Sequence, residues 1–346
     1  MDDVAIWRGG NNSSSKRERK LKCSLPLCRL PVPMKIGILS PLRANGSLTA
    51  DQLRGKVSIT YNFVGAFMTI KITTLSENTA STTHLLAEWG FSALIEIGSL
   101  TILLDAGLSS SVAHNAGILG IDLKKIDRIV LSHGHYDHTG GLQEVLRLMR
   151  KKVDIIAHPS VWDEKYTRQN DGTYRYIGIP FQRPVLESLG ASFTLSASPV
   201  RITDEVLTTG EVPEIIEYEQ IEPDRFYVRE DGELKPDILA DDLALIINTK
   251  PGLVVILGCG HRGLINTLRH AQKLTRRQEI RMVVGGCHLI GTSLERVRLT
   301  LNALQEMNVQ KIGVSHCTGL PAAAIMSREL GDKFFFNNTG TRLTLD

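Results

Sequence analysis

This chain of 346 residues has no long apolar run, few cysteines and a small net charge. No run reaches the roughly 18 apolar residues of a transmembrane helix, so we expect no membrane span. The five cysteines are an odd number, which argues against a disulfide framework and for a reducing, cytoplasmic location. A net charge of +3 gives no reason to expect a nucleic-acid partner. The composition therefore favours an ordinary enzyme for a small-molecule substrate and does not indicate an oligomeric state.

The first 66 residues also lack the apolar core of a secretory signal. They hold a Gly/Asn/Ser stretch at 9–15, the charged run Lys16–Lys20 and several prolines, without helical or strand periodicity. We expect residues 1–66 to be a disordered tail or to precede the native start, with Met34 and Met68 as other possible starts. A basic arm for nucleic acid or an acidic partner is the less favoured interpretation, because the run is short.

What the sequence does contain is a dense cluster of potential metal ligands. An apolar stretch at 126–131 predicts a buried strand, and a helical pattern begins at Leu142. Between them lie His133, His135, Asp137 and His138. His133 and His135 are two residues apart, so in extended backbone they can point the same way and share an ion. Asp137 and His138 follow on a turn and could hold a second ion. We expect one or two divalent ions, with Zn²⁺ preferred and Mn²⁺, Fe²⁺ or Mg²⁺ as alternatives.

Three later strands are each predicted to end near a further histidine. They are residues 253–257 before His261, 280–284 before His288, and 311–315 before His316. Strand ends gather along one edge of an α/β fold, where ligands usually bind. We expect His261 and His316 to be metal ligands and His288 to support the ligands or face the substrate. Cys259 could be a thiolate ligand or a buried small apolar residue, and the second reading is preferred. Ligands spread over several loops favour an open, catalytic site.

Strands alternate with helices in both halves of the chain from residue 67 onward. Helical spacing occurs at 112–119, 141–151, 262–276 and 294–307. This order predicts an α/β sandwich with helices outside two sheets. Residues 67–346 are expected to form one domain with a variable insertion around 159–242. That insertion either covers the site or is a surface excursion, and Asp241 and Asp242 at its end either face the site or form a strand-entry turn.

The run from His133 to His138 resembles the His-x-His-x-Asp-His signature of the metallo-β-lactamase superfamily. Other shared stretches extend from about residue 69 to the C-terminus; they are Leu75–Thr79, Leu86–Ser92, Gly258–His261, Gly285–Leu289 and His316–Gly319. Their order is similar to the branch that includes the archaeal 7,8-dihydropterin-6-methyl-4-(β-D-ribofuranosyl)aminobenzene-5′-phosphate synthase. The resemblance implies a four-layer αβ/βα metallo-β-lactamase sandwich of two mixed sheets with helices outside.

The resemblance also implies roles for single residues. Asp105 falls where the family carries a strand-end Asp that orients the metal loop, so we group it with Asp137 as catalytic; Asp137 could orient a water or hold the second ion. Cys259 stands where many members carry a bridging Asp, which is a departure from the common pattern. Glu77 and Asn78 lie in the first shared stretch and are expected to support the ligands or face the substrate.

Three functions from different classes follow. The first is a metal-dependent hydrolase in which a metal-bound hydroxide attacks an ester, phosphoester or amide. The second is a transferase like the dihydropterin–aminobenzene ribotide phosphate synthase, with metal-assisted diphosphate displacement. It would need basic groups for the diphosphate, for which the sequence offers Arg175, Arg183, Arg262 and Lys333. The third is a non-catalytic metal-binding protein, which the complete ligand run disfavours.

Overall fold

The computed structural model describes residues 69–221 and 224–346. The extension expected at 1–66 and the possible start at Met68 lie outside these residues. The described strands form three sheets, two large and one small. No helix in this part of the chain is both long enough and apolar enough to cross a membrane.

The first large sheet has seven strands in the order β17-β1-β2-β3-β4-β5-β8. They are β17 (Arg342–Leu345), β1 (Ile70–Ser76), β2 (Ser92–Ile97), β3 (Leu100–Leu104), β4 (Arg128–Val130), β5 (Val153–Ala157) and β8 (Ala191–Leu195). Pairing is antiparallel from β17 to β3 and parallel from β3 to β8, so the sheet is mixed. The strand expected before the histidine cluster is therefore β4, which lies inside this sheet.

The second large sheet has six strands in the order β16-β15-β14-β13-β12-β9. They are β16 (Phe334–Phe336), β15 (Ile312–Ser315), β14 (Ile280–Gly286), β13 (Gly252–Leu257), β12 (Ala244–Thr249) and β9 (Val206–Thr208). The strands β13 to β16 run parallel, whereas β12 is antiparallel to both of its neighbours. The three strands expected to end near histidines thus lie side by side.

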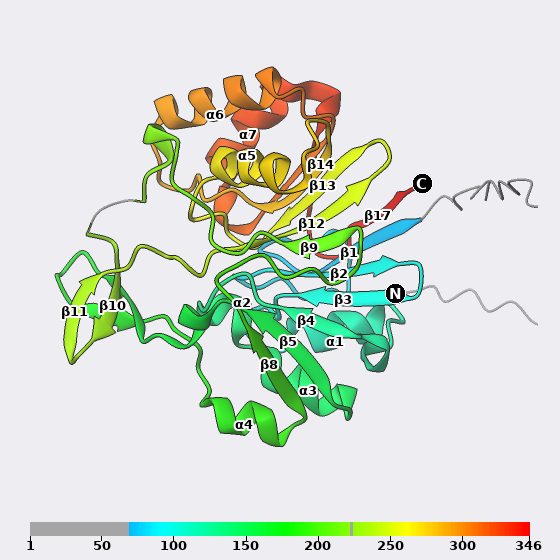
Figure 1. The fold of residues 1–346 in the computed structure, drawn as a ribbon, viewed down its shortest axis with the longest axis vertical. Helices are drawn as coiled ribbons and strands as arrows, with labels where there is room; N and C mark the ends of the chain where they lie inside the picture. The colour runs from blue at the N-terminus through cyan, green and yellow to red at the C-terminus, as the bar shows by residue number, and fades with distance from the viewer. Residues whose placement is uncertain (1–68, 222–223) are drawn as a thin grey trace, which may run out of the picture. The chain divides into compact units, whose positions relative to one another are not determined.

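Helices cover the outer face of each large sheet (Figure 1). The first sheet carries α1 (Ser111–Ile118), α3 (Leu142–Met149) and α4 (Arg183–Ser188), and the second carries α5 (Leu264–Thr275), α6 (Leu294–Glu306) and α7 (Leu320–Leu330). Four of these are the helices expected from the spacing. The sequence reading missed α4 and α7, although both have a proline in the first turn, where it suits a helix start.

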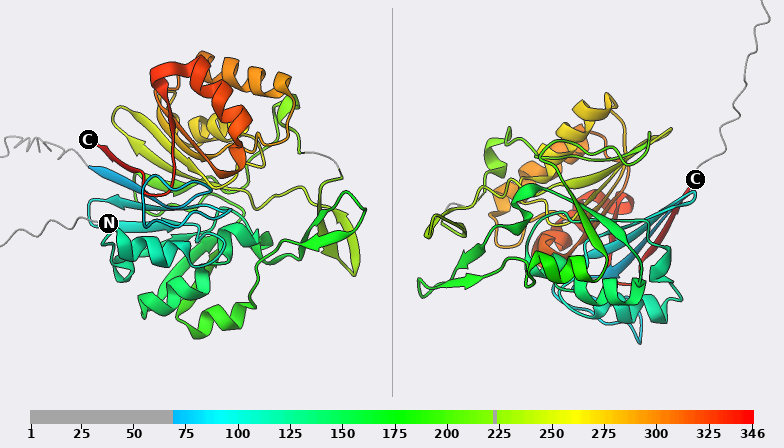
Figure 2. Two further views of the ribbon diagram at one scale, coloured as in Figure 1. Left: turned by 180° about the vertical axis from the view of Figure 1, so that it is seen from behind. Right: turned by 60° about the horizontal axis from the view of Figure 1, so that its bottom comes forward.

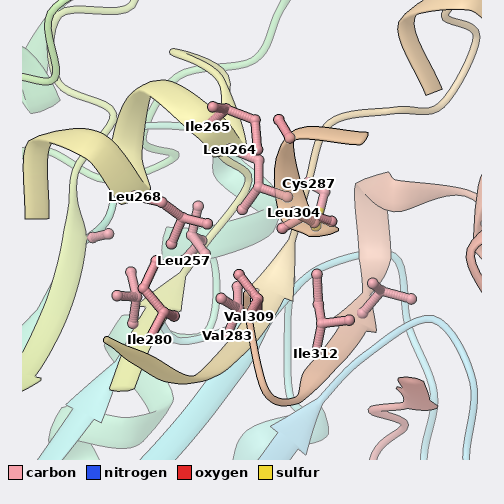
Figure 3. Packing of buried hydrophobic residues seen from close by; sticks show 14 of the residues in the cluster. Leu257, Leu264, Ile265, Leu268, Ile280, Val283, Cys287, Leu304, Val309 and Ile312 are labelled. Atoms are coloured by element: carbon pink, nitrogen blue, oxygen red, sulfur yellow. The ribbon is translucent and has the colours of Figure 1, made fainter. Parts of the chain in front are cut away.

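Alternating residues of the central strands face opposite layers. On β2, Leu94 packs toward the helices and Ile95 packs between the sheets. On β13, Val255 packs toward the helices and Val254 packs between the sheets. Side chains two apart share a face of a strand, so each sheet is buried on both sides. Figure 3 shows the helical side of the second sheet, where Leu268 of α5 lies over the strands. The four-layer αβ/βα sandwich is confirmed.

A small four-stranded sheet stands apart from the two large ones (Figure 2). Its order is β11-β10-β6-β7, formed by β11 (Glu233–Pro236), β10 (Phe226–Glu230), β6 (Lys165–Arg168) and β7 (Tyr174–Tyr176). All four strands lie within the irregular range 159–242, but β8 and β9 of the same range belong to the large sheets. Only part of that range therefore stands outside the sandwich.

Candidate metal centre

The carboxyl ends of strands from both large sheets meet at one edge of the sandwich. Asp105 follows β3, and His133 follows β4 after a short turn. From the other sheet, Cys259 follows β13, His288 follows β14, and His316 follows β15. The two groups touch, because the ring of His133 lies 4.9 Å from that of His261, centroid to centroid. Parallel strands deliver these side chains to the same edge, as the sequence predicts.

Asp105 organises the histidine loop from beneath. Its Oδ1 accepts a hydrogen bond of 2.7 Å from the Ser132 backbone N–H, and its Oδ2 accepts one of 2.7 Å from the Ser132 hydroxyl. The same Oδ2 lies 2.7 Å from Nδ1 of His138. Nδ1 of His138 therefore carries the proton, and its Nε2 is directed toward the other ligands. A Cβ at Gly258 would collide with Ser132 and Asp105, which explains the glycine there.

One group of potential ligands consists of His133, His135 and His261. Their ligand nitrogens all lie within 4.8 Å of one another. Nε2 of His133 is 3.0 Å from Nδ1 of His135. Nε2 of His135 and both ring nitrogens of His261 are buried without a hydrogen-bond partner among the described residues. Buried polar atoms are rarely left unpaired, so these nitrogens fit a site for a cation.

A second group adjoins the first and consists of Asp137, His138 and His316. Nε2 of His316 lies 3.3 Å from Nε2 of His138 and 3.3 Å from Oδ2 of Asp137. Sγ of Cys259 lies 3.1 Å from Nε2 of His138. Lone-pair atoms that converge from four side chains match the donor set of a zinc-like ion. All six residues expected to hold metal are thus brought together around one or two positions.

Two residues from the first shared stretch hold His316 in place. His316 has a left-handed backbone, with φ of +49°. Oε1 of Glu77 accepts its backbone N–H at 2.7 Å, and Oδ1 of Asn78 lies 3.0 Å from its Nδ1. The amide oxygen accepts from Nδ1–H and leaves Nε2 for the cluster. Glu77 and Asn78 therefore position His316, a potential ligand, and their expected supporting role stays a prediction.

His288 and Cys259 directly contact other residues of the cluster. The ring of His288 is 4.0 Å from that of His261, centroid to centroid, and both of its nitrogens are buried without a partner among the described residues. Cys259, His261 and His288 also form a group whose ligand atoms lie within 4.8 Å. Cys259 is buried, as expected, but its sulfur points at His138. The supporting role of His288 and the apolar role of Cys259 stay predictions, which the metal content of variants at these positions would test.

Burial sets the protonation of most of the cluster. It lowers the pKa of His133, His135 and His261 well below the usual value, so these rings are neutral, the form that binds metal. Burial would also lower the pKa of His138, but the charge and hydrogen bond of Asp105 outweigh it and raise that pKa to about 9. Burial would raise the pKa of Asp137, but His316 and the other imidazoles hold it well below the usual range.

Asp242, beside the cluster, gives a prediction for pH dependence. Burial raises its pKa from 3.8 to about 7. A carboxyl whose folded pKa lies above its unfolded value stabilises the fold while protonated, and that contribution is lost as the pH rises through the folded value. Between pH 5 and 8 the stability of Asp242→Asn relative to the parent should therefore rise by about 2 kcal/mol. Urea unfolding of both proteins in chelator measures it, and a constant difference would contradict it.

Three cavities surround this edge of the sandwich. One of about 190 Å³ is lined by cluster residues, among them His135 and His316, and by residues of the small sheet. A mostly apolar cavity of about 410 Å³ shares Trp89, Ile290 and His316 with it. A polar hollow of about 740 Å³ lies on the small sheet. Residues of the cluster therefore line two adjoining cavities.

Sequence reading missed two parts of the site. The ring of Trp89 lies 4.9 Å from that of His316, and Trp89 lines two of the cavities. Lys165 is buried and bonds to Asp237 and Asp241, whose Oδ2 accepts the Gly134 backbone N–H at 2.8 Å. Asp241 thus contacts the histidine loop, which the sequence left open. A lysine in an irregular segment carries no local sign of such a contact.

Comparison with known proteins agrees with this geometry. The 7,8-dihydropterin-6-methyl-4-(β-D-ribofuranosyl)-aminobenzene-5′-phosphate synthase of Methanocaldococcus jannaschii is 32% identical over 279 residues, which cover 78% of this chain and 95% of that protein. An uncharacterized protein of the same organism, MJ0448, is 34% identical over 70% of this chain and 88% of its own length.

A solved structure and a family model point the same way. Tm1679, described as a metal-dependent hydrolase of the β-lactamase superfamily, superposes with a TM-score of 0.69 at 28% identity, covering 80% of this chain and 99% of that one. The sequence model of the metallo-beta-lactamase superfamily matches residues 90–264, which include the histidine loop and His261. With the fold and the ligand cluster in agreement, this chain belongs to the metallo-β-lactamase superfamily.

Proposed function

We propose that this chain is a metal-dependent hydrolase acting on an ester, phosphoester or amide. The observation that carries the proposal is the set of unpartnered imidazole nitrogens on His135, His261 and His288, all of which line a cavity. Such nitrogens in a purely structural, closed site would be fully used by the ion and walled off from a substrate. Here the three residues also line a cavity of about 190 Å³, which supports a site that a substrate can reach.

The chain's residues fit one or two divalent ions, and each has a distinct task. His133, His135 and His261 would hold one ion, and Asp137, His138 and His316 a second, with Cys259 near both. A bound ion would supply a water of lowered pKa and polarise a carbonyl or phosphoryl oxygen. Asp105 keeps His138 in the tautomer that presents Nε2, and Asn78 does the same for His316.

A transferase is the second candidate, because the synthase from M. jannaschii matches over almost its whole length. Such an enzyme must keep water away from the reacting groups, and the apolar cavity beside His316 offers a place for an organic ring. Both candidates use the same ligands, so they differ in substrate and in which metal supports turnover.

The test is the metal content per chain of protein purified without added metal, measured by elemental analysis. One or two tightly held transition-metal ions, with at least one lost in His261→Ala, are the expected result. His114→Ala is the matched control, because His114 is exposed and lies outside the cluster. Tight metal would justify a screen of phosphoesters and lactones. No tight metal, with activity only on added Mg²⁺ and a pterin diphosphate, would overturn the hydrolase in favour of the transferase.

A further inference from the structure

Two arginines of the small sheet stand where two cavities meet. Arg175 on β7 and Arg225, just before β10, line the cavity over the metal ligands. Both also line the polar hollow on the small sheet, together with Thr167. A group held by these arginines would therefore lie within reach of the ligand cluster on one side and of solvent on the other.

The charges around this junction favour an anion. Among the lining residues of the metal cavity Asp137 is the one carboxylate, and it stands against the two arginines. The polar hollow adds Arg168, which two aspartates, Asp171 and Asp224, partly offset. Bound metal would add further positive charge next to the arginines. The junction thus attracts a negatively charged group.

Arg175 differs in its partners from Arg183 and Arg229, two other arginines of the domain. Arg183 and Arg229 are paired with glutamates at 2.8 and 3.1 Å. Arg175 is exposed and makes no ion pair with a carboxylate of the described residues; its guanidinium carbon lies 6.0 Å from the centre of the Tyr136 ring. Tyr136 belongs to the histidine loop, so this contact places the guanidinium beside that loop.

We propose that Arg175 and Arg225 form a phosphoryl-binding subsite, so that the substrate carries a phosphate or diphosphate group next to the bond that reacts. The inference rests on the proposed function and narrows its substrate class. A guanidinium offers a planar fork of donors that matches phosphate oxygens, and two of them can hold one phosphoryl group. The ligands then act on an adjacent bond of the same substrate, whether water or a second substrate is the acceptor.

The experiment uses the metal-loaded full chain and inorganic phosphate as the probe, with binding measured by isothermal titration calorimetry. Arg175→Gln is expected to weaken phosphate binding about tenfold, and the double variant with Arg225→Gln about a hundredfold, as expected for loss of one and two charge-assisted contacts. Arg175→Lys should bind phosphate with intermediate affinity. Lys235→Gln is the matched control, because Lys235 is exposed on the small sheet and lines neither cavity.

Metal content, measured on the same samples, separates this inference from the proposed function. Phosphate binding that stays within twofold of the parent in Arg175→Gln and in the double variant, with metal content unchanged, would overturn the subsite. Tighter binding of acetate than of phosphate would also overturn it, because the junction would then select carboxylates. If the chain proved not to be a hydrolase, the variants would still differ from the parent in their affinity for phosphate. Arg175 is exposed, so we expect Arg175→Gln to fold like the parent. Its phosphate affinity therefore tests the subsite even if the double variant folds poorly.

Discussion

His135→Ala is expected to abolish uptake of the ion that it would hold with His133 and His261 and to lower activity by at least about a thousandfold. The imidazole lies 3.0 Å from His133 and its Nε2 has no partner among the described residues, so metal binding is the role left for it. A metal supplies several kcal/mol of transition-state stabilisation, and about 4 kcal/mol corresponds to a thousandfold in rate. Elemental analysis and a turnover assay on any substrate found by screening measure the two effects.

The matched control is again His114→Ala, which removes an exposed histidine that lies outside the cluster. It should retain the metal and the activity of the parent. If His135→Ala lost its metal yet kept full activity, the metal-dependent mechanism would be wrong, whatever the substrate. If it kept both, His135 would not be a ligand.

Lys165→Met is expected to lower the free energy of unfolding by about 3–5 kcal/mol. Lys165 is 1% exposed and its Nζ lies 2.8 Å from Asp237 and 3.0 Å from Asp241. Burial alone would lower the pKa of this lysine, but the two carboxylates raise it well above the ordinary value, so the charge is present in the fold. Removing it leaves two carboxylates buried without their counter-charge.

Urea unfolding in the presence of chelator measures this loss without a contribution from metal. Lys235→Met is the control, because the ion pair of Lys235 with Glu230 is about half exposed and should contribute less than about 1 kcal/mol. A loss below 1 kcal/mol for Lys165→Met would show that water reaches the two aspartates. Because Asp241 also accepts the Gly134 N–H, we expect the Lys165 variant to hold metal more weakly.

The sequence could place these histidines near one another because they are close in the chain or follow a strand of clear apolar pattern; their role as metal ligands stays a prediction. His133 to His138 occupy six positions, and His261, His288 and His316 each come within a few residues of the end of a buried strand. Parallel strands leave few places where such ends can go. The alternation of Leu94 and Ile95 between layers follows from the same strand periodicity.

What the sequence could not predict depends on contacts between distant parts of the chain. Lys165 meets Asp241 across 76 residues, and Gly134 meets Asp241 across 107. Neither contact leaves a local pattern, because the range that contains Lys165 and Asp241 lacks clear periodicity. The direction of the Cys259 sulfur is equally non-local, since a buried apolar cysteine and a thiolate ligand look alike in sequence.

The division of the ligands between two sheets has a consequence for how the protein acquires its metal during synthesis. His138 and His316 face each other at 3.3 Å but are separated by 178 residues of chain. At about 5–20 residues per second, a ribosome needs roughly 10 to 35 seconds to add that stretch. During this interval the growing chain contains His138 but not yet His316. Loading of the complete pair must therefore wait until the second sheet has been translated and has docked.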